Sequence, residues 1–241
     1  MCGRYTLTAS MEDLLAEFDL LEPLAIKPRY NVAPTQFMPV IRVEEPKEST
    51  APSETPRRQA VLMRWGLTPS WAKDAAIANR TINARSETVA TQASFRAAFK
   101  RRRCLVPCSG FYEWKVIGEK NGQPVKQPYL IRPASGGLLA LAGLWECWRP
   151  ADAEPVHTYT ILTTGANTFM AALHERMPVI VGRENYTAWL DPQSQDPGVL
   201  QGLLQPARCD LGAIPVNTRV NNVRNDDAAC LDGVNEGTLF G

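Results

Sequence analysis

The first two residues of the chain could carry an unusual chemistry. Removal of Met1 would leave Cys2 with a free α-amine beside its thiol. A terminal amine titrates at about pH 8 and a cysteine thiol at about 8.5, so both reach nucleophilic forms near neutral pH with modest help from neighbouring groups. Such a 1,2-aminothiol can attack an amide carbonyl through sulfur. It can also condense with an aldehyde to an imine that the sulfur closes into a thiazolidine ring.

Three other polar residues could assist such a nucleophile. Glu113 stands between two aromatic residues, and a carboxyl group among aromatic rings is partly desolvated, which raises its pKa toward the range useful for proton transfer. The alternative for Glu113 is the solvent face of an edge strand. His174 is expected at a helix end beside Arg176, where a histidine can move protons near neutral pH. Asn83 can orient or hydrogen-bond a reacting group.

Several residues are candidates for nucleic-acid contact. Arginine makes up 19 of the 26 basic residues, and its guanidinium binds phosphate and stacks on bases, although the base composition of the genome explains such a bias equally well. Arg80 and Arg85 could face phosphate, and an exposed Trp71 would offer a stacking face for a base. The run 100–103 is expected to be a solvated basic face. The net charge of +1 decides little, because a local basic stripe is enough to bind nucleic acid.

Composition places the chain among soluble globular proteins. Its 241 residues are 44% hydrophobic and 21% charged, and they contain neither a secretory leader nor an apolar run of about 18 residues. Six cysteines in such a chain indicate reduced thiols and a cytoplasmic location. Cys104 and Cys108 are four residues apart, but both histidines lie far from them, so no metal is expected. No cofactor is expected either.

The hydrophobic pattern predicts an α+β fold that is mostly antiparallel sheet, closed into a barrel-like or sandwich core with short covering helices. A capping box at Ser10 and Asp13 begins a helix over 11–18, and Asn121-Gly122 predicts a hairpin turn. The chain is expected to be a single domain over 1–241, with a mobile loop over 44–58 and a polar tail over 226–241. Further strands are predicted at 3–8, 38–43, 60–67, 104–115 with a bend at Pro107 or Gly110, 128–132, 138–146, 157–164, 179–181 and 211–216, and further helices at 167–173, 183–190, 198–204 and a short one capped by Ser94.

Six short motifs occur in an order that resembles one protein family. They are CGRY at 2–5, YNVAP at 30–34, WG at 65–66, NAR at 83–85 with Glu87, GFYEW at 110–114 and HERMP at 174–178. Together they are similar to the SRAP family, the SOS-response-associated peptidases, from residue 2 to about residue 225.

The resemblance implies a single β-rich SRAP domain whose Cys2, freed by removal of Met1 by the protein itself, captures the ring-opened aldehyde of an abasic site in single-stranded DNA. The product is a covalent thiazolidine crosslink that shields the lesion. In this scheme Asn83 orients the terminus and the opened sugar. Glu113 handles protons at the amine and is tied to Met1 removal and to reversal of the crosslink, a lyase-like step. His174 assists opening of the deoxyribose ring.

The resemblance also assigns a DNA path. Arg4, Arg85 and Arg176 match phosphate-contacting positions, whereas Asn31, Pro34 and Trp71 would line the path and wedge or stack at the lesion. Ala72 follows Trp71 where some relatives carry a second aromatic residue. The expected partner is single-stranded DNA with abasic sites, bound by a monomer that associates with the nucleoid through DNA. The choice between single strands and single-strand/duplex junctions stays open.

Two other functions compete with this one. An amidohydrolase with an N-terminal nucleophile, such as a glutamine amidotransferase, would use the Cys2 sulfur on an amide and the amine as base, but it gives no role to Glu113 or His174. A non-covalent DNA-binding module would make Cys2 incidental. Replacement of Cys2 with alanine separates all three functions.

Overall fold

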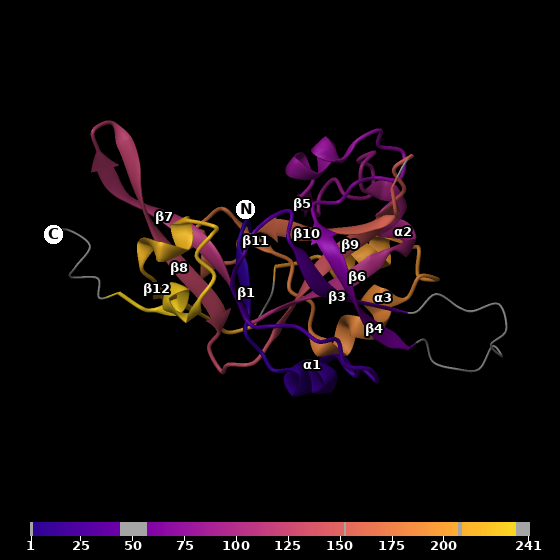
Figure 1. Ribbon diagram of the computed structural model, residues 1–241, viewed down its shortest axis with the longest axis horizontal. Helices are drawn as coiled ribbons and strands as arrows, with labels where there is room; N and C mark the ends of the chain where they lie inside the picture. Colours follow the sequence, from indigo (N-terminus) through magenta and orange to yellow (C-terminus); the bar gives the residue numbers. More distant parts are fainter. Residues whose placement is uncertain (1, 44–56, 152, 207–208, 235–241) are drawn as a thin grey trace.

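The computed structural model describes residues 2–43, 57–151, 153–206 and 209–234. Two β-sheets form the framework of this part of the chain, and short helices pack around them (Figure 1). The predicted loop over 44–58 falls almost wholly outside the described residues, and its last residue, Arg58, already begins a strand. Within the described ranges, no helix has both the length and the apolar character that a bilayer crossing requires.

Five strands form a closed ring. In ring order they are β10 (Val156–Gly165), β4 (Arg58–Trp65), β3 (Phe37–Val43), β6 (Arg103–Cys108) and β9 (Leu139–Trp148), and β9 pairs again with β10. Only β10 and β4 run parallel within this ring, and β10 also carries the short strands β5 (Asn83–Arg85, parallel) and β11 (Arg176–Pro178, antiparallel). The predicted class of a closed, mostly antiparallel sheet with short helices is confirmed.

A second sheet lies beside this barrel. Its strand order is β12 (Leu211–Pro215), β8 (Gln123–Pro133), β7 (Gly110–Lys120), β1 (Tyr5–Leu7) and β2 (Arg29–Val32), with antiparallel neighbours throughout. The β7–β8 hairpin extends beyond the body of the protein (Figure 1). Its turn is the predicted one, because Asn121 and Gly122 both have the positive φ angles, 53° and 73°, that a tight hairpin turn needs.

The predicted strand over 104–115 is two strands in two sheets. The chain leaves the barrel at Cys108 and enters the second sheet at Gly110. A side chain at Gly110 would bring its Cβ within 2.9 Å of the Ile131 carbonyl oxygen, so the change of sheet needs a glycine here. The expected bend therefore carries the chain from one sheet to the other.

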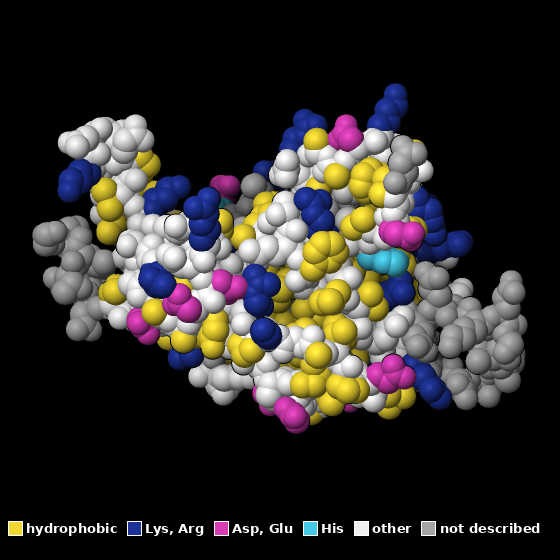
Figure 2. Space-filling model, viewed as in Figure 1, with side chains coloured by type: hydrophobic (Ala, Val, Ile, Leu, Met, Phe, Trp, Pro, Cys, Tyr) yellow, Lys and Arg dark blue, Asp and Glu magenta, His cyan; other side chains and the backbone are white. Residues whose placement is uncertain are grey.

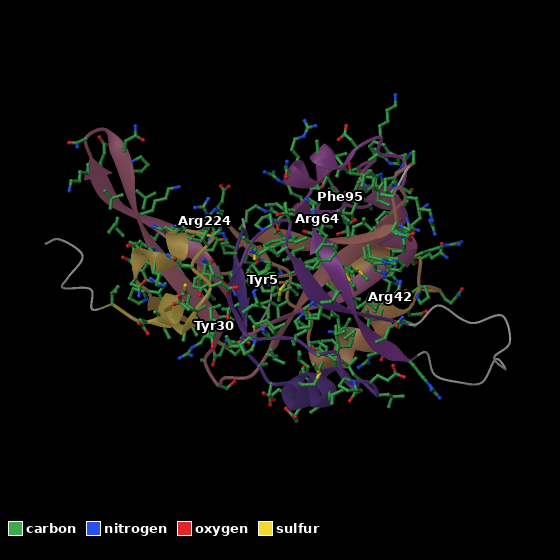
Figure 3. The ribbon with its side chains drawn as sticks, in the orientation of Figure 1. Tyr5, Tyr30, Arg42, Arg64, Phe95 and Arg224 are labelled. Carbon is green, nitrogen blue, oxygen red and sulfur yellow. The ribbon has the colours of Figure 1, made fainter. Side chains whose placement is uncertain are left out.

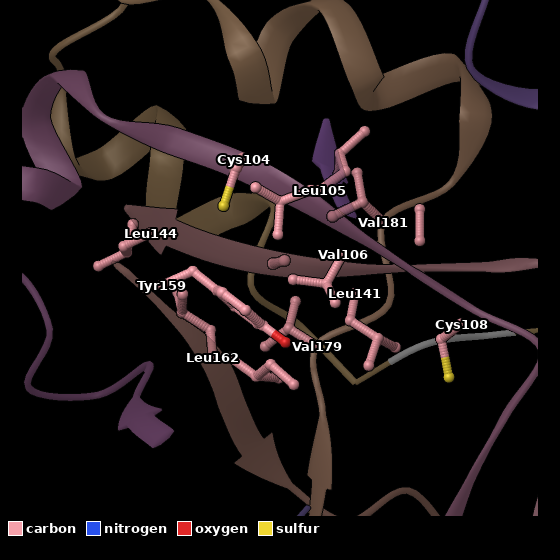
Figure 4. Packing of buried hydrophobic residues seen from close by; sticks show 14 of the residues in the cluster. Cys104, Leu105, Val106, Cys108, Leu141, Leu144, Tyr159, Leu162, Val179 and Val181 are labelled. Carbon is pink, nitrogen blue, oxygen red and sulfur yellow. The ribbon is translucent and has the colours of Figure 1, made fainter. Parts of the chain in front are cut away.

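The core fills the barrel and extends to β1. Aliphatic side chains of β6, β9 and β10 pack inside the ring (Figure 4). Tyr5 reaches across from β1 to hydrogen-bond the Tyr159 hydroxyl at 2.8 Å, and its ring lies 5.3 Å from that of Trp65, which stacks on Tyr159 at 6.2 Å. These three buried rings attach β1, which carries Tyr5 (Figure 3), to the barrel. Cys2, three residues before Tyr5, is thereby held close to the barrel.

Short helices complete the fold. Helix α1 (Met11–Phe18) begins with the predicted Ser10–Asp13 capping box. Helix α2 (Arg96–Arg101) buries Phe95, Ala98 and Phe99 as expected, but the predicted Ser94 cap is wrong, because Phe95 is the cap residue and makes no side-chain bond. The others are α3 (Tyr186–Leu190), α4 (Pro197–Gly202) and the 3₁₀ turns η1 (Ala75–Arg80), η2 (Met170–Ala172), η3 (Arg183–Asn185), η4 (Thr218–Asn221) and η5 (Ala228–Leu231). The strand predicted at 179–181 lies earlier in the chain, as β11. Ile180 itself makes only an isolated bridge to Leu141.

One residue of the predicted solvated basic run is buried. Arg103 is 2% exposed, and its guanidinium lies 5.6 Å from the Trp189 ring centroid. All of its N–H groups donate to backbone carbonyls at the ends of α2 and α3, those of Phe99, Lys100, Trp189, Asp191 and Ser194. Burial lowers the pKa of Arg103 to about 10, and the residue joins the two helices to the barrel.

Candidate active site at the amino terminus

Cys2 lies immediately before β1, at the boundary between the two sheets. It is 0% exposed, and its Sγ is 3.9 Å from the Arg4 carbonyl oxygen. Burial is the main reason why the pKa of the Cys2 thiol is well above its ordinary value, and the nearby Cys108 and Glu113 raise it further. This direction applies to the chain with Met1 attached, and there burial favours the neutral thiol. The expectation that the thiol ionises near neutral pH concerns Cys2 after Met1 is removed, and it stays a prediction.

Asn83 holds the backbone of Cys2. Its Nδ2 donates to the Cys2 carbonyl oxygen at 2.9 Å, and the register of β5 against β10, with Asn83 opposite Ile161, fixes the position of the side chain. The Asn83 Oδ1 is buried and accepts no hydrogen bond from the residues that the structure describes. A buried amide oxygen normally has a donor, so this atom can accept one from a group at the terminus.

Glu113 comes from the second sheet. It lies on β7 opposite Tyr129 and is 3% exposed, so the desolvated position expected from its aromatic neighbours is confirmed and the solvent face is excluded. Burial is the largest influence on the Glu113 carboxyl and raises its pKa, whereas the charge of His174 acts in the opposite direction. Glu113 and His174 therefore interact electrostatically across the boundary between the sheets.

His174 is half-buried in the turn before β11. Its backbone N–H donates to the Met170 carbonyl oxygen at 2.8 Å, and its Nδ1 accepts from the backbone N–H of Arg176 at 3.0 Å. Because Nδ1 is the acceptor, the heavy-atom geometry assigns the proton of the neutral ring to Nε2. Proton exchange with a substrate would then occur at Nε2.

Arg176 makes its contacts inside the protein. The residue is 9% exposed, and its two terminal nitrogens bind the two oxygens of Glu87 at 2.8 and 3.0 Å. One of them also donates to the Thr163 carbonyl oxygen at 2.7 Å. The predicted phosphate contact by Arg176 stays a prediction, and in this structure its two terminal nitrogens are bound to Glu87 and Thr163.

Asn31 and Arg4 form a second polar group, in which Asn31 is buried and Arg4 is half-buried. Asn31 is 0% exposed, accepts from Arg4 Nη1 at 2.9 Å, and donates through Nδ2 to carbonyl oxygens of the C-terminal segment, those of Val220, Asn222 and Asn225. Arg4 also lies 5.8 Å from the centroid of the Trp114 ring. Asn31 was expected to line a DNA path, but the structure places it beneath the surface.

The other predicted DNA contacts lie at the surface. Trp71 is 60% exposed, Arg85 is exposed, and Pro34 is half-buried. Figure 2 shows a notch between the β7–β8 hairpin and the segment that carries η1, with Lys and Arg side chains on both sides, and the amino terminus lies at this notch in Figure 1. A hollow of about 550 Å³ beside the terminus is lined by Gly3, Arg4, Trp114, Pro124, Lys126 and Asn221.

Sequence reasoning missed the role of the tail. Asp226 accepts hydrogen bonds from the backbone N–H groups of Tyr30 at 2.6 Å and Asn31 at 2.9 Å, and it pairs with Arg29. Tyr112 donates to the Tyr30 carbonyl oxygen at 2.7 Å. The described part of the predicted polar tail is thus packed against β2, and no local pattern indicates a contact between residues 195 positions apart.

The described ranges bring together no group of three or more His, Cys, Asp or Glu residues that could hold a metal ion. The cluster at the amino terminus consists of a buried cysteine, an amide, a carboxyl group and an imidazole. Such a set can orient an electrophile and move protons around it.

Comparisons with known proteins agree with the fold and the motifs. Residues 1–223 match the family described as SOS response associated peptidase (SRAP). The chain is 38% identical over 236 residues to the abasic site processing protein YoqW of Bacillus subtilis, which spans 96% of this chain and 99% of that one. It is 35% identical over 229 residues to the abasic site processing protein HMCES of Gallus gallus, with 85% and 66% of the two chains covered.

Solved structures share the fold. A crystal structure of a protein from Bacteroides thetaiotaomicron superimposes with a TM-score of 0.80 over 97% of this chain and 100% of that one, at 24% sequence identity. A second, from Bordetella bronchiseptica, gives a TM-score of 0.72 over 90% and 100%, at 25% identity. The arrangement of the two sheets is thus found in other solved proteins.

Proposed function

The chain belongs to the SOS response associated peptidase family, and from this membership and the geometry around Cys2 we propose that it processes abasic sites in DNA by covalent capture. The relatives YoqW and HMCES are named abasic site processing proteins. The observation that carries the proposal is the position of Cys2, whose carbonyl is held by Asn83 while Glu113 and His174 interact beside it.

The buried thiol favours a reaction that begins at the amine. After hydrolysis of the Met1–Cys2 peptide bond, the Cys2 amine adds to C1′ of the ring-opened deoxyribose, and loss of one water gives an imine. The Cys2 Sγ then adds to the imine carbon while its proton passes to the nitrogen, which closes a thiazolidine. This second step starts from a neutral thiol, so the raised pKa of Cys2 does not prevent it.

The three neighbouring side chains have distinct roles in this scheme. Asn83 holds the terminus through the Cys2 carbonyl, and its Oδ1 is an acceptor for the new amine. Glu113, whose pKa is raised by burial, is the group that donates and accepts protons at the amine. His174, with its proton on Nε2, assists ring opening of the sugar.

The same carboxyl group suits two further steps. Removal of Met1 requires a proton for the departing Cys2 amine. Reversal of the crosslink returns the thiazolidine N–H proton to sulfur as the C–S bond breaks, and hydrolysis of the resulting imine then requires a proton for the departing amine. Glu113 is the buried acid beside that nitrogen in the scheme. We assign both the self-cleavage and the lyase-like reversal to it.

Single-stranded DNA is the proposed partner. The exposed Trp71 offers a stacking face and the exposed Arg85 a phosphate contact. Pro34 is half-buried and is the proposed wedge at the lesion, and Arg4 borders the hollow beside the terminus. Asn31 and Arg176 take a different role in this scheme, because their polar atoms bind other parts of the protein. We propose that they position the contact residues.

The proposal is tested by denaturing gel electrophoresis. The protein is mixed with uracil-containing single-stranded DNA, with and without uracil-DNA glycosylase, and its intact mass is measured separately. The expected result is a shifted band that needs the glycosylase, is absent for Cys2→Ala and comes from protein that lacks Met1. Protein that lacks Met1 but forms no such band would refute the proposal. Glutamine hydrolysis dependent on Cys2 would then favour the amidohydrolase.

A further inference from the structure

The ion pair between Arg176 and Glu87 connects the elements that carry Asn83 and His174. Glu87 lies two residues after β5, and Arg176 is the first residue of β11. Each terminal nitrogen of Arg176 donates to one oxygen of Glu87, Nη1 to Oε1 and Nη2 to Oε2. Two parallel hydrogen bonds fix the orientation of the pair as well as its distance. Arg176 is 9% exposed, whereas the Glu87 side chain is 51% exposed.

Arg176 and Ser86, the residue before Glu87, are also joined to β10, the strand between them. The Thr163 carbonyl oxygen on β10 accepts from Arg176 Nη2 at 2.7 Å and from the Ser86 backbone N–H at 2.9 Å. Thr163 is opposite Arg85 in the β5 pairing and opposite Pro178 in the β11 pairing. The ion pair therefore closes a connection from β5 through β10 to β11.

This connection reaches the imidazole through the backbone of Arg176. The N–H that binds His174 Nδ1 belongs to Arg176 itself. A displacement of Arg176 would move that donor and release Nδ1, and the ring could then rotate or change tautomer. The Arg176 side chain is held by Glu87, whose own pKa is lowered chiefly by the hydrogen bonds from Arg176.

We propose that Glu87 is a positioning residue for His174, acting through Arg176. The carboxylate holds the guanidinium in place, the backbone of Arg176 holds Nδ1, and Nε2 is left as the nitrogen that exchanges protons with the substrate. The inference rests on the proposed function for its kinetic consequence, but the state of the imidazole can be measured without DNA.

The first experiment reads the imidazole directly. The chain has two histidines, His157 and His174, so ring ¹⁵N signals can be assigned with the single variant His157→Gln. At a pH at which the ring is neutral, the wild type should show an unprotonated Nδ1 and a protonated Nε2. Glu87→Gln, which keeps the shape of the side chain, should show averaging of the two tautomers.

A matched control separates positioning from simple charge removal. Glu175→Gln removes the same charge from the residue next to His174. The backbone carbonyl of Glu175 accepts from the Ala166 N–H at 3.0 Å, and this substitution leaves that hydrogen bond in place. We expect Glu175→Gln to keep the wild-type ¹⁵N pattern. The same averaging in both variants would overturn the proposal, because the cause would then be the loss of a nearby charge.

The second experiment measures crosslinking and DNA affinity. Glu87→Gln should slow crosslink formation roughly 10-fold, at the lower end of what loss of a supporting hydrogen-bond partner costs, and Glu87→Asp should recover part of the rate. In the Cys2→Ala background, Glu87→Gln should leave the affinity for undamaged single-stranded DNA unchanged. Tighter DNA binding with an unchanged ¹⁵N pattern would overturn the proposal and make Glu87 a competitor for a phosphate site on Arg176. If the wild type forms no crosslink, the proposed function fails, and the ¹⁵N comparison still decides the role of Glu87.

Discussion

Replacement of Asn31 by alanine should destabilise the C-terminal segment. The two N–H groups of Asn31 Nδ2 serve three carbonyl oxygens of that segment, at 2.7 to 3.1 Å, and Oδ1 accepts from the Arg4 guanidinium at 2.9 Å. Neutral hydrogen bonds contribute about 1 kcal/mol each and a bond from a charged group about 1.5–3 kcal/mol. Arg4 keeps its second bond, to the Val220 carbonyl, which reduces the loss. We therefore expect the free energy of unfolding to fall by about 3 kcal/mol.

The assay is urea unfolding followed by tryptophan fluorescence, together with amide hydrogen exchange over 217–234. A loss of about 3 kcal/mol corresponds to a melting temperature about 6–12 °C lower for a chain of this size. Hydrogen exchange should speed up most in the C-terminal segment, because that is where the three acceptors lie. Asn79→Ala, at an exposed asparagine of η1, is the control and should change the free energy of unfolding by less than about 0.5 kcal/mol.

The same variant tests the earlier expectation that Asn31 contacts DNA. If the main role of Asn31 is to form its buried hydrogen bonds, the affinity for single-stranded DNA should fall only slightly. The cause of that fall would be the loss of the hydrogen bond from Arg4 to Asn31. A variant with unchanged stability and unchanged hydrogen exchange, but with lost DNA affinity, would refute this reasoning. Asn31 would then have to leave its buried position in the complex.

Three further outcomes follow from the structure. Arg103→Met should lower the free energy of unfolding by at least about 3 kcal/mol, measured in urea, because five carbonyl groups lose their donors; a smaller loss would mean that water replaces the guanidinium. Trp71→Ala should weaken binding to single-stranded DNA by about 1–3 kcal/mol in a fluorescence titration, with stability unchanged because the ring is 60% exposed; equal affinity would exclude stacking. The pKa of Glu113 is raised on folding. As pH rises, the unfolded chain therefore loses the Glu113 proton at a lower pH than the folded chain does. The free energy of unfolding should fall between about pH 4.3 and the raised pKa. Glu113→Gln should remove that fall in urea titrations over a pH series, and an unchanged slope would contradict the raised pKa.

Features encoded by neighbouring residues could be predicted from the sequence. The α1 capping box needs Ser10 and Asp13, three residues apart, and the hairpin turn needs only Asn121 and Gly122. Their geometry is set by local hydrogen bonds and by φ angles, which the sequence specifies directly. For Glu113 the sequence left both a desolvated position and the solvent face of an edge strand open, and the structure decides for burial.

Features that depend on distant partners could not be predicted. Glu87 and Arg176 are 89 positions apart, and Arg103 reaches carbonyls 86 to 91 positions away. Arginines are most often solvated, so a basic run gives no sign that one member is buried. The position of the Cys2 thiol has the same origin: its raised pKa comes from packing between two sheets, which a terminal residue does not reveal.

The placement of Cys2 between the two sheets explains why the candidate site needs the whole fold. Asn83 and His174 reach it from strands and turns attached to β10, whereas Glu113 reaches it from β7 of the second sheet. The chain passes between these sheets at Ser109 and Gly110, next to β1: Ser109 N–H donates to the Thr6 carbonyl oxygen at 2.8 Å, and its Oγ accepts from Thr8 N–H at 2.9 Å. The segment that joins the two sheets therefore packs against β1, the strand that Cys2 precedes. A change in the relative position of the sheets would move the carboxyl group away from the imidazole and the amide, and the chemistry of the terminus depends on that register as much as on the four side chains.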